Sequence, residues 1–143
     1  MKRASLGQVL LKAARLFNDE AIARVNAQTG RQLRYAHTQL LPHLGSDGIR
    51  ATELARRVGV SKQAVGVLLD EMLSWGVIER VRDPSDGRAL LVRLTPAGQA
   101  ATVQGLSVLG QLADEVEAAM GERAVRKLHK RLTELVEVLE ARG

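Results

Sequence analysis

The residues best suited to recognising a partner molecule lie within residues 51–69, ATELARRVGVSKQAVGVLL. They stand at and just after the start of the second of two short predicted helices in this stretch. Gln63 can donate and accept hydrogen bonds in the paired geometry of an adenine edge, and Lys62 can reach a guanine or a phosphate. Val67 can contact a thymine methyl group. The backbone amides of a helix start, together with the Ser61 hydroxyl, favour a phosphate. These residue types point to recognition of duplex DNA.

Two short helices must cross at a steep angle to present these residues. In this pair, the first helix is capped by Thr52 and ends at Val58. Its small residue Ala55 faces the second helix. Gly59 suits the turn that follows, and Ser61 caps the second helix, which ends near residues 75–76. This is the spacing of a helix-turn-helix unit, whose second helix enters a major groove.

Helical periodicity divides the second helix of this unit into two faces. The inward positions follow i, i+3, i+4 and i+7 spacing and are Val65, Leu68, Leu69 and Met72. The outward positions are Gln63, Gly66, Val67 and Ser74, with Lys62 near the edge. Gly66 lets the backbone approach a partner closely. Polar residues at an isolated helix start are usually only solvated, but the complete pattern favours contact with DNA.

A predicted β-hairpin follows this helix. Strand-forming runs at residues 77–82 and 89–94 flank the polar tip DPSDGR at residues 83–88. Arg88 lies at the tip, Arg80, Arg82 and Arg93 lie on the strands, and such arginines suit a minor groove or the phosphate backbone. Asp86 is expected to orient Arg88 through a charge-assisted pair. The alternative is a solvated turn with an exposed ion pair of little energetic value.

Longer helices flank this central region. Apolar spacing predicts one helix from Leu6 to about residue 28 and another from about Arg31 to Leu44. Thr95 followed by Pro96 marks the start of a fifth helix, which its glycines should weaken. A sixth helix from Glu122 carries a leucine seam that needs an apolar partner. Either a second copy of the chain or another helix of the same chain can supply it.

The order helix, helix, helix-turn-helix, hairpin, long helix, long helix, with DPSDGRALLVRLTPAG at residues 83–98, resembles the MarR family of winged helix-turn-helix transcription regulators. The resemblance covers residues 1–143 as one domain, with a DNA-binding lobe at 31–98 and a helical dimerisation region at 1–30 and 99–143. It implies a mainly α fold with a small β-hairpin wing. It also implies a homodimer that represses a pseudopalindromic operator. Family members commonly carry two arginines at the wing tip, but Gly87 stands at the first position here, which leaves Arg88 as the minor-groove residue.

Composition further narrows the classes of molecule that this chain is expected to bind. The net charge is +5, but residues 101–143 hold six basic and seven acidic side chains, so the excess lies in the first two thirds. Only three residues, Phe17, Tyr35 and Trp75, are aromatic, which argues against stacking on single-stranded nucleic acid. The absence of cysteine excludes thiol redox sensing and cysteine-based zinc sites. Duplex DNA is the expected partner.

Neither catalysis nor a resident cofactor is indicated. His37, His43 and His129 form no metal motif, and no nucleophile accompanies the carboxylates Asp70 and Glu71. We therefore expect a non-enzyme with no metal and no membrane partner, located in the cytoplasm.

Two further points stay open from the sequence. The resemblance implies a small anionic or aromatic effector, for which Arg15, Arg34 and His37 are weak candidates, and the ligand site is unknown. The alternative function is a winged-helix scaffold for protein interactions in a chromosome or transcription assembly. Such a scaffold would more often carry an apolar patch where Lys62 and Gln63 stand.

Overall fold

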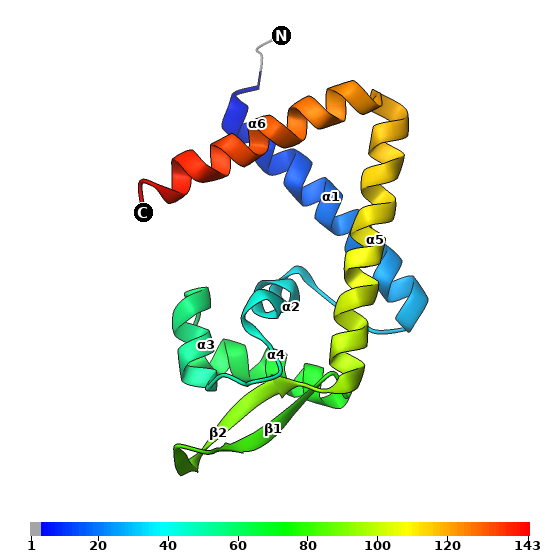
Figure 1. Cartoon of the computed structure of the whole chain (residues 1–143). Helices are drawn as coiled ribbons and strands as arrows, with labels where there is room; N and C mark the ends of the chain where they lie inside the picture. Colours follow the sequence, from blue (N-terminus) through cyan, green and yellow to red (C-terminus); the bar gives the residue numbers. More distant parts are fainter. Residues whose placement is uncertain (1–3) are drawn as a thin grey trace. The chain divides into compact units, whose positions relative to one another are not determined.

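The structure is a computed structural model that describes residues 4–143 and divides into two compact units, Met1–Leu106 and Ser107–Gly143. Its elements in chain order are α1 (Leu6–Thr29), α2 (Tyr35–Leu40), the 3-10 turn η1 (Leu41–His43), α3 (Ala51–Val58), α4 (Lys62–Ser74), β1 (Ile78–Asp83), β2 (Asp86–Leu94), α5 (Pro96–Met120) and α6 (Glu122–Glu140) (Figure 1). This is the predicted mainly α fold with a β-hairpin wing.

Helix α1 begins and ends where the sequence predicts. A capping box closes its start: the Gln8 amide donates to Ser5 Oγ at 3.2 Å, and the Ser5 amide donates to Gln8 Oε1 at 2.9 Å. Gly30 ends the helix in the left-handed conformation with φ +72°, which glycine adopts without steric cost. Local sequence signals are therefore sufficient for this element.

The second helix is shorter than predicted, and the expected span from Arg31 to Leu44 is wrong at both ends. Helix α2 begins only at Tyr35, because the Asn26 side chain exchanges two 2.9 Å hydrogen bonds with the backbone of Leu33 and holds the link extended. At the other end Pro42 has no amide hydrogen for a further α-helical bond, and the chain forms the 3-10 turn η1.

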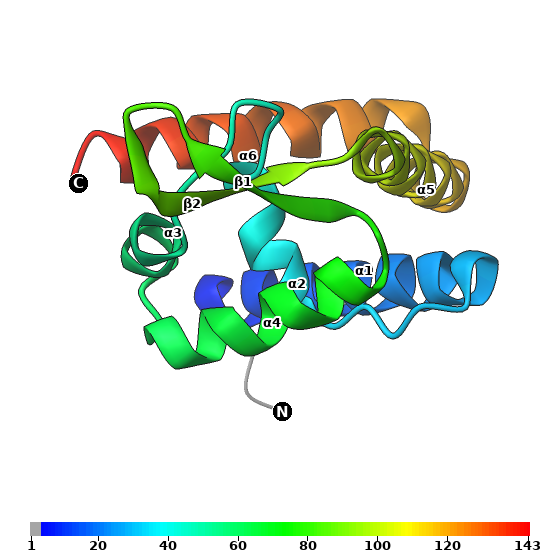
Figure 2. The same cartoon turned by 90° about the horizontal axis from the view of Figure 1, so that it is seen from below.

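The helix-turn-helix forms as predicted apart from its first cap. Helix α3 starts at Ala51, so Arg50 and not Thr52 occupies the N-cap position, where it makes no side-chain cap bond. Gly59 ends α3 with φ +77°, and Ser61 Oγ accepts the Ala64 amide at 3.1 Å at the start of α4. Figure 2 shows the short turn that joins α3 to α4.

The hairpin pairs in register from Ile78 with Leu94 to Arg82 with Leu90. An irregularity between Arg82 and Asp83 then places Asp83 opposite Asp86, so the turn is tighter than the predicted tip. Ahead of α3, Ile49 exchanges two backbone hydrogen bonds of 2.9 and 2.8 Å with Val92. The segment before the helix-turn-helix is thereby joined to β2.

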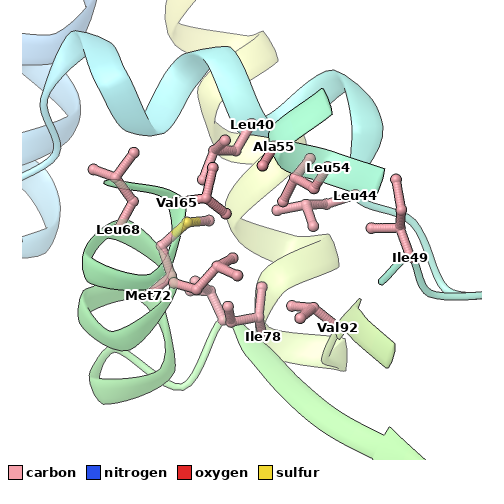
Figure 3. Close-up of a cluster of buried hydrophobic side chains, with 12 residues drawn as sticks. Leu40, Leu44, Ile49, Leu54, Ala55, Val65, Leu68, Met72, Ile78 and Val92 are labelled. Atoms are coloured by element: carbon pink, nitrogen blue, oxygen red, sulfur yellow. The ribbon is translucent and has the colours of Figure 1, made fainter. Parts of the chain in front are cut away.

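One hydrophobic core binds α2, α3, α4 and the hairpin together. Its most buried side chains are Leu40, Leu54, Val65, Leu69, Met72, Ile78 and Val92 (Figure 3). Truncating a buried leucine of this kind to alanine typically costs about 2–5 kcal/mol. Because every element of the helix-turn-helix and the wing contributes to this core, their relative positions are fixed.

Hydrogen bonds of Thr95 join the start of α5 to the turn that follows α4. The Thr95 hydroxyl accepts the Gly98 amide at 3.0 Å and donates to the Gly76 carbonyl at 2.6 Å. A Cβ atom at Gly98 would lie 1.9 Å from the Val77 carbonyl oxygen, so only glycine fits. Helix α5 runs unbroken to Met120 although it holds three glycines.

In the second unit, α6 is amphipathic and has no buried residue. Its predicted seam is largely open to solvent: Leu128, Leu132 and Leu139 are exposed, and Val125 and Leu135 are half-buried. None of the described helices is long and apolar enough to cross a membrane.

Candidate nucleic-acid interface

The first two turns of α4 present the residues that the sequence singles out. Ser61 is committed to the helix cap, whereas Lys62 and Gln63 are exposed and Val67 has 60% of its surface open. Lys62 makes no ion pair with any residue in 4–143. These side chains are therefore available to a partner.

The opposite face of α4 explains why these residues stay outward. Val65 and Leu69 are fully buried, Met72 is 1% exposed, and Leu68 is also buried in the core. The predicted inward and outward faces are confirmed. Gly66 lies between them, and a Cβ atom there would meet nothing within 4 Å. Packing within the chain therefore does not demand glycine at this position.

The wing carries a second group of exposed cations. Arg82 on β1 and Arg88 on β2 are exposed and form no ion pair within the described residues. The other two strand arginines are neutralised: Arg80 lies 3.3 Å from the Asp70 carboxylate, and Arg93 lies 2.8 Å from Glu79. The hairpin therefore presents two free guanidinium groups, and one of them lies beside the tip.

The predicted charge pair between Asp86 and Arg88 does not form. Asp86 Oδ1 instead accepts the backbone amide of Arg88 at 3.1 Å, while its Oδ2 faces the Arg50 guanidinium at 4.0 Å. Asp86 thus shapes the backbone at the tip and leaves the Arg88 side chain free. The tight turn favours this, because an Asp side chain two residues before an amide closes a local ring readily.

Sequence reasoning missed a contact between the wing and the helix-turn-helix. Arg50 Nε and Nη2 lie 2.9 and 2.7 Å from Asp83 Oδ2, and the amide and hydroxyl of Ser85 donate to Asp83 Oδ1 at 2.9 and 2.7 Å. The Ser85 hydrogen bonds, with the Arg50 contact, lower the pKa of Asp83 to about 2. The Asp-Pro-Ser sequence signals the local turn, but nothing nearby in sequence signals Arg50.

A second missed arrangement lies on α3. Glu53 accepts hydrogen bonds from both Arg56 and Arg57, and these bonds lower the pKa of Glu53 to about 2. The i, i+3 and i, i+4 spacings were visible in the sequence and predict this pairing. Because one carboxylate serves two guanidinium groups, α3 keeps a net positive charge beside α4.

A buried histidine joins α2 to the C-terminal end of α4. His37 is fully buried, its ring lies 4.7 Å from the Trp75 ring, and its Nδ1 accepts the Arg34 amide at 2.9 Å. Nε2 therefore carries the proton of the neutral ring; it has no hydrogen-bond partner in the described chain and lies 3.6 Å from Glu71 Oε1. Burial lowers the pKa of His37, although the Glu71 carboxylate acts in the opposite direction.

The residues considered for an anionic effector are not gathered into a site. Arg34 is paired with Glu71 at 2.5 Å, His37 is enclosed in the core, and Arg15 is exposed on α1. Within residues 4–143 no cluster of histidine and carboxylate side chains could hold a metal ion.

Comparison with known proteins identifies the lobe that carries these features. The sequence model of the MarR family matches residues 31–89, which span α2, the helix-turn-helix and the hairpin up to the start of β2. Residues 31–89 match the MarR family, and the fold is that of its winged-helix regulators. No curated protein sequence matches it.

Solved structures of MarR, of a MarR family protein and of a probable transcriptional regulator share the fold along almost the whole chain. Wild-type MarR from Escherichia coli in its apo form superposes with a TM-score of 0.76 at 23% identity, covering 94% of this chain and 98% of that one. A Mycobacterium tuberculosis MarR family protein in complex with salicylic acid gives 0.70 at 27% identity, with 94% and 98% covered. A probable transcriptional regulator from Pseudomonas aeruginosa gives 0.60 at 25%, with 92% and 96% covered.

The wing tip departs at one position from the pattern that the resemblance to the MarR family implies. Gly87 stands where members commonly carry the first of two arginines, and its backbone is not in a left-handed conformation. A Cβ atom at Gly87 would meet nothing within 4 Å, so the fold does not require glycine there. The tip therefore depends on Arg88 for its charge.

Proposed function

We propose that this MarR-family chain is a homodimeric transcription regulator that binds duplex DNA at a pseudopalindromic operator and represses transcription. Lys62, Gln63 and Val67 contact bases and backbone in a major groove, with Ser61 and Gly66 at the backbone. Arg82 and Arg88 reach the adjacent minor groove or phosphates, with Asp86 shaping the tip. The proposal assigns no catalytic activity and places the protein in the cytoplasm.

One observation carries this proposal. The exposed polar turn of α4 and the free arginines of the wing belong to one rigid lobe, held by a shared core. A fixed lobe can place a helix in one groove and a cation beside the next without an ordering cost on binding. A protein-interaction scaffold would more often carry an apolar patch on this surface, whereas here the charged Lys62 and the amide of Gln63 stand beside the exposed Val67.

Binding-site selection on random duplex DNA tests the proposal. We expect one enriched, two-fold symmetric sequence, and fluorescence anisotropy on that duplex should show affinity falling steeply with salt. Lys62→Ala should weaken binding, while Lys127→Ala on α6 removes the same charge outside the lobe and serves as the control. Failure to enrich any sequence, or equal losses in both variants, would refute the assignment of the site.

The homodimer is supported by the exposed seam of α6. A 19-residue helix with no buried residue and leucines on one stripe is stable when another apolar surface covers it. Leu132→Glu places a charge in the middle of this seam, and Lys130→Glu alters charge on the same helix outside it. We expect light scattering to show a dimer that only Leu132→Glu dissociates. A monomeric wild-type chain would contradict the dimer.

We also propose that a small aromatic acid releases the DNA. The support is the M. tuberculosis relative, solved in complex with salicylic acid. Adding salicylate to the protein bound to its selected duplex should lower the anisotropy, while benzyl alcohol, which lacks the carboxylate, should not. Equal responses to both compounds, or to neither, would contradict a carboxylate-specific effector.

A further inference from the structure

Arg50 contacts both parts of the DNA-binding lobe, the helix-turn-helix and the wing. Its backbone is the N-cap of α3, and the preceding residue, Ile49, is hydrogen-bonded to Val92 on β2. Its guanidinium group extends to the wing and directs two nitrogens at one oxygen of Asp83. A single side chain therefore connects the start of the helix-turn-helix with the turn of the hairpin.

The contact continues from Asp83 along the tip. The second oxygen of Asp83 accepts both donors of Ser85, and Arg50 Nη2 also faces Asp86 Oδ2 at 4.0 Å. Asp86 in turn accepts the amide of Arg88. The Arg50 guanidinium thus lies within reach of both carboxylates that shape the turn from which Arg88 projects.

We propose that Arg50 is a positioning residue that fixes the wing tip relative to the recognition helix and so sets where Arg88 meets DNA. This inference rests on the proposed function and adds a residue to which the DNA-contact assignment gives no role. Arg50 acts through Asp83 and Asp86 and reads no base itself.

Burial and charge both make this contact consequential. The Asp83 side chain is only 11% exposed, so removing Arg50 leaves a mostly covered carboxylate without its cation. Removal of Arg50 also leaves the carboxylates of Asp83 and Asp86 without a compensating positive charge beside the DNA phosphates. Lysine cannot replace the arrangement, because its single ammonium group lacks the fixed, planar pair of donors.

A first test needs no DNA. Hydrogen exchange followed by mass spectrometry should show the amides of residues 83–88 exchanging about tenfold faster in Arg50→Met than in wild type. Residues 62–74 should exchange as before. Arg57→Met is the matched control, since Arg57 is also partly exposed and paired with a carboxylate on α3. Unchanged exchange at 83–88 in a folded Arg50→Met would overturn the proposal, as would the same change in Arg57→Met.

A double-mutant cycle on the selected duplex tests the role in binding. Arg50→Met should weaken binding about five- to tenfold in the wild-type background and hardly at all when Arg88 is already alanine. Arg57→Met should have the same effect in both backgrounds. Arg50→Lys, which keeps the charge, should resemble Arg50→Met in the cycle and guards against a misfolded methionine variant.

The outcomes separate this inference from the proposed function. If Arg88→Ala weakens binding but Arg50→Met costs the same with or without Arg88, then Arg50 contacts DNA directly and the positioning role is wrong. If Arg88→Ala weakens binding and Arg50→Met has no effect, the positioning role again fails alone. If the wild-type chain binds no duplex, both proposals fail together.

Discussion

The two faces of α4 hold side chains of similar size for different purposes. On the inner face, Val65, Leu69 and Met72 are enclosed by α2, α3 and the hairpin, so their surroundings dictate their type. On the outer face, Lys62, Gln63 and Val67 are exposed, so packing among residues 4–143 does not dictate their type. The fold accounts for the first set and leaves the second to be explained by a partner.

The hairpin repeats this contrast among its arginines. Arg93 and Arg80 are neutralised by carboxylates, whereas Arg82 and Arg88 form no ion pair with the part of the chain that the structure describes. Substitutions on the inner positions should therefore change stability, those on the outer and free positions should change binding, and those on the paired positions should change both much less. A substitution that changed both equally would break the comparison.

The largest effect is expected for Leu69→Ala on the inner face of α4. Removal of a fully buried leucine should lower the free energy of unfolding by about 2–5 kcal/mol, because a cavity remains in a close-packed core. Urea denaturation followed by the fluorescence of Trp75 measures this. Val67→Ala on the outer face is the control and should leave the midpoint nearly unchanged. A loss below about 0.5 kcal/mol at Leu69 would show that the core description is wrong.

The next effect concerns base recognition by Gln63. Gln63→Ala should lose about 1–3 kcal/mol of discrimination at one base pair in each half-site, since a paired amide contact to an adenine edge is removed. Anisotropy titrations of duplexes with single base changes measure this preference. Thermal unfolding should not move, because Gln63 is exposed. Unaltered discrimination at every position would remove Gln63 from the base-reading set.

A smaller effect separates the free from the paired arginines of the wing. Arg88→Ala should reduce the slope of log affinity against log salt by about one for each bound subunit, as one phosphate contact is lost. Arg93→Ala removes the same charge from a residue already bound to Glu79 and should change the slope much less. Equal changes in slope would mean that pairing within the hairpin does not determine which arginines meet DNA.

The smallest effect is a pH dependence of stability that comes from the inner side of the lobe. Burial lowers the pKa of His37 below 6.5, so the unfolded chain takes up a proton before the folded chain does. The contribution of the neutral, buried His37 to the free energy of unfolding is fully present above about pH 6.5 and falls as the pH drops below that value. Urea midpoints between pH 5 and 8 should show this decline, and His37→Gln should flatten it. A midpoint that rises as the pH falls would contradict the sign.

Local rules account for what the sequence predicts correctly. Ser61, Gly59 and the spacing of Val65, Leu69 and Met72 act within a few residues, so the helix-turn-helix and the outward face of α4 follow from the sequence. The same holds for Thr95 at the start of α5.

The features that the sequence does not reveal depend on residues far apart or on side chains that compete with the backbone. Arg50 and Asp83 are 33 positions apart, and only the folded hairpin brings them together. The Asn26 side chain binds the backbone of Leu33, so α2 begins later in the chain than apolar periodicity indicates. Asp86 could bind either the side chain or the amide of Arg88, and the tight turn favours the amide.

The central claim is that the outer face of α4 and the free wing arginine bind duplex DNA together. The most direct measurement is the salt dependence of affinity for the selected duplex in wild type and in the Lys62→Ala/Arg88→Ala double variant. Loss of one phosphate contact at each residue should reduce the slope by about two for each bound subunit, with the thermal midpoint unchanged. A slope that stays at the wild-type value in the folded double variant would contradict the account.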